Sequence, residues 1–216
     1  MNTQHTPRER IRQRLGQYCD PAALTGDFAV AGMPREQREL KPASVLVPLV
    51  ERASGLTVLL TQRSEHLPHH AGQISFPGGR AEPNDASPVE TALRETEEEI
   101  GLERRHVELV GFLDPYQTMT GFLVTPVVGF VTPVFQLNPD PYEVTDIFEV
   151  PLEFVLDPRN HERRSRLLKG QERHFYVLPY RHYYIWGATA AMLVNLAQKI
   201  GRAGHESALR QPVLHS

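Results

Sequence analysis

The sequence predicts an α/β or α+β fold, arranged as a sandwich around a mixed β-sheet. At 216 residues the chain suits one domain, and its 40% hydrophobic content is enough to fill a core. Strand-like segments surround one helix in the middle of the chain and another near its end, an order that differs from a run of βαβ units. Because no internal repeat or low-complexity linker divides the chain, we expect a single main domain.

The strand candidates combine β-branched, aromatic and other apolar residues between turn-forming residues. They lie at 44–52, 56–63, 72–79, 107–114, 122–131, 144–150, 174–180 and 182–187. Ala53 to Gly55 predict a turn between the first two. The third is expected to end in a Pro-Gly-Gly turn.

Helices are predicted near both ends of the chain and at two places between them. Residues 6–18 place Ile11 and Leu15 on one face of a short amphipathic helix, and a loop rich in Pro, Gly and charge follows to about Lys41. A short helix is expected at 151–157. The last helix, at 188–200, places an apolar set on one side: Leu193, Leu196, Ala197 and Ile200.

Local rules predict a well-defined helix in the middle of the chain. Ser87 is a suitable N-cap, Pro88 takes the first helical position, and Glu90 completes a capping box. Gly101 is placed to end the helix in a left-handed conformation. Residues at helical spacing are expected to face the core: Val89, Ala92, Leu93, Thr96 and Ile100.

This helix carries a cluster of carboxylates whose spacing indicates a metal site. Glu95, Glu98 and Glu99 stand at i, i+3 and i+4, so their carboxylates converge on one face, whereas Glu97 points away. Arg94 lies one turn before Glu98 and is expected to orient the cluster. Converging carboxylates raise one another's pKa unless a cation neutralises them, and an all-oxygen set selects Mg²⁺ or Mn²⁺. The alternative is a solvated acidic face, for which Lys at i+4 positions is expected and absent.

Charge and apolar content argue against several classes of protein. A formal net charge of -3 leaves no basic footprint for nucleic acid. No apolar run is long enough to cross a membrane, and the N-terminal segment lacks the apolar core of a signal peptide. The single cysteine, Cys19, cannot form a disulfide within the chain. We therefore expect a cytoplasmic protein that binds neither nucleic acid nor membrane.

The residues around the carboxylate helix resemble the Nudix box, a motif of the form Gly-x5-Glu-x7-Arg-Glu-apolar-x-Glu-Glu-x-Gly-apolar. Here the pattern begins at Gly79 and continues into "RETEEEIGL". The matching residues are Arg94, Glu95, Glu98, Glu99, Gly101 and Leu102, and Thr96 fills the usually apolar position. Asp85 replaces the first Glu of the motif, and one extra residue separates it from Arg94. These departures leave the role of Asp85 open.

The longer spacing is similar to that of the coenzyme A pyrophosphatase branch of the Nudix family. A second signature of that branch resembles "LLTQRSEHLPHHAGQISFPGG", at Leu59 to Gly79. Shorter similarities are "TPVVGF" at 125–130, "FEVPL" at 148–152 and "IWGATA" at 185–190. The resemblance covers roughly residues 43 to 200.

This resemblance implies an α/β/α sandwich that hydrolyses a nucleoside diphosphate linked to another group. Mg²⁺ or Mn²⁺ would be held by Glu95, Glu98, Glu99 and the carbonyl of Gly79, and Arg94 would hold the glutamates by hydrogen bonds. Which glutamate is the general base stays open, because the assignment varies across the family. The implied substrate is coenzyme A or an acyl or oxidised form. Its cleavage would release 3′,5′-ADP and 4′-phosphopantetheine or the acylated form.

Further candidate site residues lie outside the helix. Gly78 and Gly79 let the backbone approach an anionic ligand or a metal. Arg63 and Arg80 are candidates for binding the 3′-phosphate and the pyrophosphate, with a strand cap and plain surface as their respective alternatives. Glu143 is a candidate for a late metal ligand, with a surface role as its alternative.

One loop and one aromatic residue are weaker candidates. His66, His69 and His70 bracket a loop that is expected to lie near substrate, and the absence of cysteine partners argues against zinc there. Trp186 is expected in the core rather than as a stacking surface for adenine.

The expected organisation is an N-terminal helix and loop at 1–40, a Nudix domain at 41–200 and a polar tail at 201–216. The N-terminal segment has two places to pack, on its own domain or on a second subunit, so a monomer and a homodimer both stay open. One rival function is hydrolysis of NADH, ADP-ribose or a nucleotide sugar by the same chemistry. Another is a Nudix-fold binding module without catalysis, which the complete set of box glutamates argues against.

Overall fold

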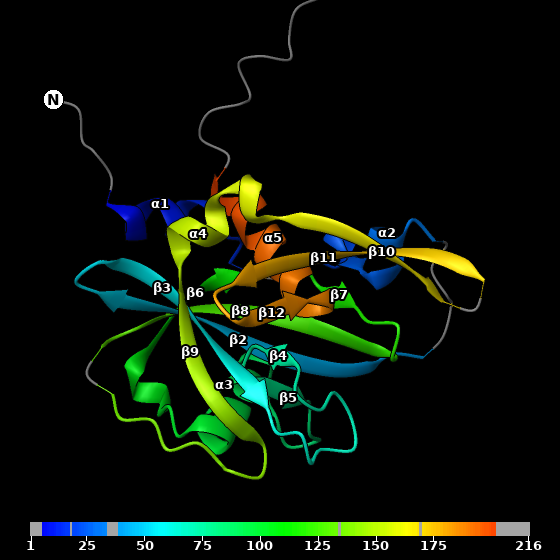
Figure 1. Ribbon diagram of the computed structural model, residues 1–216. Helices are drawn as coiled ribbons and strands as arrows, with labels where there is room; N and C mark the ends of the chain where they lie inside the picture. The colour runs from blue at the N-terminus through cyan, green and yellow to red at the C-terminus, as the bar shows by residue number, and fades with distance from the viewer. Residues whose placement is uncertain (1–5, 18, 34–38, 134, 169, 202–216) are drawn as a thin grey trace, which may run out of the picture.

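The fold is a mixed β-sheet with helices on both faces. The computed structural model describes residues 6–17, 19–33, 39–133, 135–168 and 170–201. Figure 1 shows α1 (Pro7–Arg14), α4 (Leu152–Leu156) and α5 (Gly187–Gly201) above the sheet, and α3 (Pro88–Ile100) below it. The predicted α+β sandwich around a mixed sheet is confirmed.

The main sheet runs in the order β1-β7-β8-β2-β3-β4, with β5 pairing with β2, β6 with β8 and β9 with β3. The strands are β1 (Thr25–Gly26), β2 (Lys41–Arg52), β3 (Gly55–Arg63), β4 (Ile74–Ser75), β5 (Gly78–Arg80), β6 (Val107–Phe112), β7 (Tyr116–Gln117), β8 (Phe122–Val131) and β9 (Val144–Pro151). The two central strands, β2 and β8, are parallel. On its other edge β2 pairs with β3 from Leu49 onward and with β5 from Ala43 to Val45, so β3 and β5 diverge beside it.

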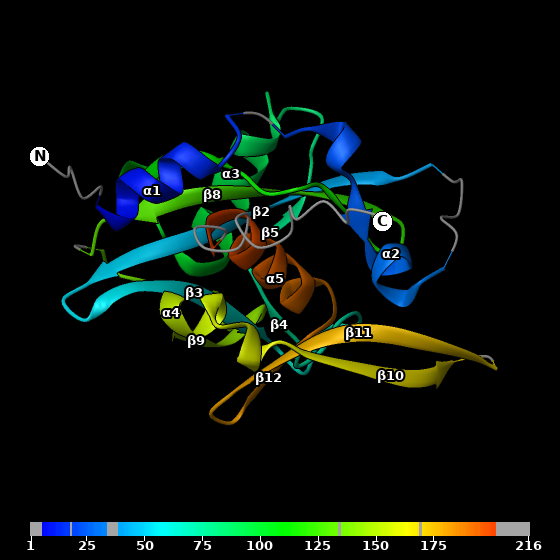
Figure 2. The same ribbon diagram turned by 90° about the horizontal axis from the view of Figure 1, so that it is seen from above.

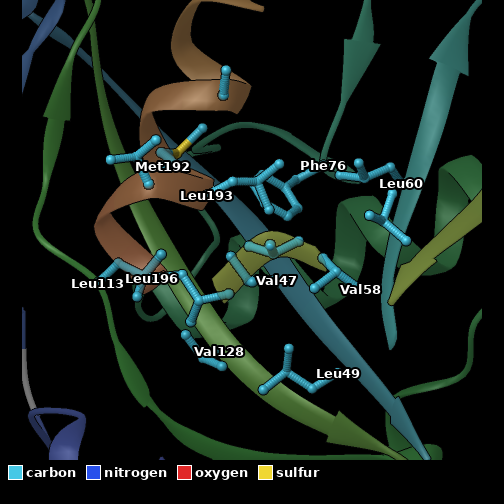
Figure 3. Close-up of a cluster of buried hydrophobic side chains, with 14 of the residues drawn as sticks. Val47, Leu49, Val58, Leu60, Phe76, Leu113, Val128, Met192, Leu193 and Leu196 are labelled. Carbon is cyan, nitrogen blue, oxygen red and sulfur yellow. The ribbon is translucent and has the colours of Figure 1, made fainter. Parts of the chain in front are cut away.

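Side chains of the central strands alternate between two cores, as the pleat requires. The larger core lies under α1, α4 and α5, and Figure 3 shows part of it, where Phe76 lies between Leu193 of α5 and Leu60 of β3. The smaller core lies under α3 and includes Leu46, Val50, Leu59, Ala92 and Ile100. Since β2 and β3 supply residues to both cores, the sheet fixes the position of α3 relative to α5.

A second, smaller sheet follows α4. It contains β10 (Glu162–Leu168), β11 (Gln171–Tyr180) and β12 (Tyr183–Trp186), all antiparallel. The β10–β11 hairpin extends beyond β12 in both ribbon views, and Arg166 pairs with Arg173 across it (Figures 1 and 2).

Most predicted strands and helices are present, and the differences have local causes. The first helix ends at Arg14 rather than residue 18, although Ile11 and Leu15 are buried as predicted. The predicted Pro-Gly-Gly turn is wrong, because Gly78 and Gly79 belong to β5 and pair with β2. The apolar side predicted for α5 is too narrow. The sheet, α1, α4 and β11 surround this helix, and its buried residues also include Ala190, Ala191, Met192 and Val194.

Several short or polar helices and strands were not predicted from the sequence. The predicted loop before Lys41 contains η1 (Pro21–Ala23), β1 and α2 (Asp27–Ala31). Neighbours distant in sequence hold β1 and α2, as in the pairing of Thr25 with Tyr116 and the contacts of α2 with β11. β7 is too short to give a periodic signal, and β10 ("ERRSRLL") lacks strand-like alternation. The remaining short elements are η2 (Arg104–His106) and η3 (Pro158–Asn160).

The N-terminal helix packs on its own domain. Ile11 and Leu15 belong to the larger core, and Arg8 forms ion pairs with Glu51 of β2 and Glu108 of β6. None of the helices in the described residues is long and apolar enough to span a membrane.

Candidate active site

Helix α3 begins and ends where its sequence predicts. The hydroxyl of Ser87 accepts a hydrogen bond from the backbone N–H of Glu90 at 3.3 Å, and Gly101 adopts φ = 69° at the C-cap. The reciprocal half of the predicted capping box is wrong, because the carboxylate of Glu90 pairs with Arg104 instead. Thr96 is buried at the box position that is usually apolar, where its hydroxyl donates to the carbonyl of Ala92. The buried residues of α3 between Ala92 and Ile100 pack against the core. The opposite face of the helix is therefore directed toward Gly78 and Gly79 of β5.

The carboxylate of Glu99 is buried at the inner end of this face, with only 4% of the residue exposed. It accepts a 3.0 Å hydrogen bond from the backbone N–H of Gly78 and a 3.4 Å contact from Nη1 of Arg63. Burial, with the nearby charges of Glu143 and Glu95, raises the pKa of Glu99 to about 7. A buried carboxylate in this state would be stabilised by an additional positive charge.

Glu95 lies against Gly79. A methyl group added to Gly79 would meet the carboxylate of Glu95 at 2.4 to 2.6 Å, so that carboxylate would have to move from its position. Burial raises the pKa of Glu95 and the charges of Glu98 and Glu143 add to the effect, while Arg94 opposes it. Gly78 is required for a separate reason: it adopts φ = 147°, and a side chain there would strike the backbone of β2.

Arg94 connects the glutamates to the loop before the helix. Its Nε and Nη2 each donate to a different oxygen of Asp85 at 3.0 Å, and its Nη1 donates to Glu98 at 2.9 Å. It also lies 3.1 Å from an oxygen of Glu95 and donates to the carbonyl of Arg80. The bonds from Arg94 hold the pKa of Asp85 well below its usual range. Asp85 therefore anchors the arginine despite the extra residue between them.

The other two glutamates of the cluster are more exposed and differ in their partners. Glu98 is more than half exposed, while Glu97 turns away and pairs with Arg104, as expected for a residue outside the converging face. Glu143 lies in the turn just before β9, and its carboxylate raises the pKa values of both Glu95 and Glu99. The structure thus brings the four predicted carboxylate ligands, Glu95, Glu98, Glu99 and Glu143, to one region.

A cavity of about 950 Å³ begins beside this region and extends to the β10–β11 hairpin. Arg63, Arg80, Gly78, Gly79 and Glu143 all line it. The loop histidines His69 and His70 also line it, whereas His66 is not among the described lining residues. Arg63 does not act as a simple strand cap, since its guanidinium reaches Glu99. Arg80 is exposed, and its guanidinium lies 5.1 Å from the ring centre of Phe122.

The hairpin supplies cavity residues that the sequence analysis missed. Arg166 and Arg173 line the cavity, together with aromatic residues of β11. Trp186 also lines it and is only partly buried, so the expectation of a core position is wrong. No motif marked these residues, because the pairing of β11 with β10 and β12 brings them to the cavity.

The profile of the NUDIX domain matches residues 40–170, more than half of the sequence. The chain belongs to the Nudix family. An uncharacterized Nudix hydrolase named NudL from Photorhabdus laumondii is 42% identical over 158 residues, which cover 73% of this chain and 84% of that protein. NudL from Citrobacter koseri is 41% identical over 162 residues, covering 74% and 83%. These relatives are named as hydrolases without a stated substrate, and this Nudix chain is likewise a hydrolase enzyme.

Solved Nudix structures show partial similarity to the chain. The MutT protein from Methanosarcina mazei has a TM-score of 0.44 and 25% identity, covering 56% of this chain and 84% of that one. The NUDIX domain of Shewanella oneidensis NrtR, complexed with ADP ribose, has a TM-score of 0.42 and 24% identity, covering 56% and 78%.

Nudix enzymes generally use divalent metal cations, and the residues of this Nudix box fit such a group. The candidate ligands are carboxylate oxygens with the adjacent carbonyl of Gly79, the donor type that hard cations prefer. Burial and mutual repulsion raise the pKa values of Glu95 and Glu99, which an added cation would reverse. Within the described residues, no three acidic, His or Cys side chains already stand in metal-ligand geometry. Arg94 and Arg63 instead contact the carboxylates directly.

Proposed function

We propose that this Nudix hydrolase cleaves the pyrophosphate bond of coenzyme A, or of its acyl or oxidised forms, with Mg²⁺ or Mn²⁺ as cofactor. The observation that carries the proposal is the course of Leu59–Gly79, the segment that resembles the coenzyme A pyrophosphatase signature. It runs through β3, the loop that carries His66, His69 and His70, and β4 into β5, and many of its residues from Arg63 onward line the cavity. This supports a role for the signature in selecting the substrate.

The size and charge of the cavity also support a large anionic substrate. Its volume of about 950 Å³ is at the upper end of the range for small-molecule sites. Its described lining residues include more cations than carboxylates: Lys41, Arg63, Arg80, Arg166 and Arg173 against Asp27 and Glu143. A nucleotide with several phosphate groups would be attracted by this balance of charge.

The residues around the carboxylates would have separate roles in hydrolysis. Bound divalent cations would supply positive charge for the pyrophosphate and activate water for attack. Glu95, Glu98 and Glu99 would hold them, and Arg94, anchored by Asp85, would fix the positions of Glu95 and Glu98. Arg63, already beside Glu99, would bind a phosphate oxygen and balance negative charge as it develops.

Product analysis tests the substrate. The protein is incubated with coenzyme A, NADH or ADP-ribose in the presence of Mn²⁺, and the products are resolved by chromatography. We expect 3′,5′-ADP and 4′-phosphopantetheine from coenzyme A, at the highest rate of the three substrates. Absence of 3′,5′-ADP alongside fast turnover of another compound would refute the proposal. Since the similar NrtR domain was solved with ADP ribose, that compound is the most informative competitor.

A further inference from the structure

We infer that Arg166 and Arg173, on the β10–β11 hairpin, form a subsite for a phosphate monoester on the ribose, separate from the pyrophosphate that is cleaved. The inference rests on the proposed function and specifies it: the monoester would be the 3′-phosphate of coenzyme A. The hairpin arginines would then make the enzyme prefer coenzyme A to substrates that lack this group.

The first observation is that these guanidiniums have no carboxylate partner among the described residues. Arg173 is partly buried, and its Nε has no hydrogen-bond partner in that part of the chain. Its Nη1 donates to the sulfur of Met119, which is a weak acceptor. Arg166 lies over aromatic rings, 5.4 Å from the centre of Trp186 and 5.9 Å from that of Phe175. A buried N–H without a strong acceptor is costly, and an anion in the cavity would give the guanidinium a charged acceptor.

The second observation is that these two cations oppose each other. Arg166 and Arg173 are directly paired across the antiparallel hairpin, and both line the cavity. Like charges opposite each other are destabilising on a sheet unless an anion lies between them. Arg164 on the same strand differs, because it pairs with Phe175 across the hairpin and forms an ion pair with Glu162.

The third observation is the distance from the carboxylates. Gly78 pairs with Val45 near the Nudix box, whereas Lys41, the first residue of β2, pairs with Phe122 just after the turn that contains Met119. The four residue-to-residue steps from Val45 to Lys41 span about 13 Å at roughly 3.3 Å per step. Arginine side chains that extend from the two ends of this span shorten the gap, so one nucleotide can reach both the Nudix box and the hairpin arginines. Arg63 then binds the pyrophosphate, while Arg166 and Arg173 bind the second phosphate.

The aromatic residues beside the subsite fit the same ligand. Phe175 and Trp186 contact each other edge to face, with ring centres 5.8 Å apart, and both line the cavity. An aromatic surface next to paired arginines suits a base attached to a phosphorylated ribose.

A matched pair of substrates tests the subsite, because 3′-dephospho-coenzyme A differs from coenzyme A only in this phosphate. We expect Arg173→Met and Arg166→Met to raise KM for coenzyme A by about 10- to 100-fold, with kcat changed less than about 3-fold. KM for the dephospho form should stay within about 2-fold of wild type, because its missing phosphate makes no bond to lose. Arg173→Lys should recover part of the affinity, since it keeps the charge. Arg164→Met is the matched control on the same strand, and it should leave KM unchanged for both substrates.

Equal changes in KM for both substrates, or no change for either, would overturn the subsite. Melting temperatures of all variants identify any loss of folding, and Arg166→Met gives a second, more exposed position should Arg173→Met be unstable. If wild type cleaves neither substrate, the proposed function fails, and calorimetry then tests the subsite by itself. Binding of 3′,5′-ADP at least 10-fold tighter than 5′-AMP, lost in Arg173→Met, would support it. Equal affinities for the two nucleotides would refute it.

Discussion

At the scale of single residues, chemically identical glutamates differ only through their partners. Glu97 pairs with Arg104 outside the converging face, while Glu98 is held by Arg94 and Glu99 is buried against the N–H of Gly78. Sequence spacing alone predicted that Glu97 would stand apart. The metal and catalytic roles of the others stay a prediction, for which this difference supplies an internal control.

Glu98→Gln and Glu99→Gln should each lower turnover by about 10²-fold or more, because each removes a charged oxygen ligand from the expected metal site. Glu97→Gln on the same helix should keep nearly full turnover. The measurement is the initial rate at saturating Mn²⁺, combined with the Mn²⁺-dependent rise in melting temperature. That rise should shrink only in the first two variants. Wild-type rates in both of them would exclude the metal role.

Gly79→Ala tests the close approach of the backbone to Glu95. The added methyl group would lie 2.4 to 2.6 Å from that carboxylate, so Glu95 must move. We expect turnover to fall at least about 10-fold, as small displacements of catalytic groups do. Gly201→Ala, where an added methyl group meets nothing within 4 Å, is the control. Unchanged rates in both variants would show that Glu95 tolerates displacement.

At the scale of elements, α3 and the loop before it act as one unit. Asp85 receives bonds from Arg94, from the hydroxyl of Thr91 and from the N–H of Glu82, so the loop closes back onto the helix. This explains how one extra residue is tolerated between Asp85 and Arg94. The loop changes its path, while the ion pair between its end points is preserved.

Ser87→Ala should lower the free energy of unfolding by about 1 kcal/mol, because it removes the acceptor for the N–H of Glu90 at the start of α3. Ser87→Asp keeps an acceptor and should lose much less. Urea denaturation of both variants checks this, with turnover measured in parallel. Since the carboxylates lie two to three turns away, turnover should stay within about 2-fold of wild type. A large loss of activity without a loss of stability would contradict this reading.

At the scale of the whole molecule, the N-terminal helix completes the larger core. Ile11 is 5% exposed and Leu15 is 4% exposed, both against residues of the sheet and α5. Of the two packing sites that the sequence left open for this helix, the structure shows the one on its own domain.

Ile11→Ala should destabilise the protein by about 2 to 5 kcal/mol, as expected when a buried side chain is truncated. Arg10→Ala, one residue earlier on the exposed side of α1, should change stability by less than about 0.5 kcal/mol. Chemical denaturation at two protein concentrations provides the measurement. A loss that depends on protein concentration would indicate that α1 packs on a second subunit instead.

The sequence by itself determined the elements whose signals are local. The caps and apolar stripe of α3, the alternating central strands and the convergence of Glu95, Glu98 and Glu99 all follow from residues close together in the chain. Only the tertiary structure decided what distant segments contribute. It brings Arg63 to Glu99, places Gly78 and Gly79 in a strand beside α3, and carries Arg166 and Arg173 to the far end of the cavity. The physical reason is that strand pairing and burial join residues far apart in sequence, and no local periodicity encodes which strands will pair.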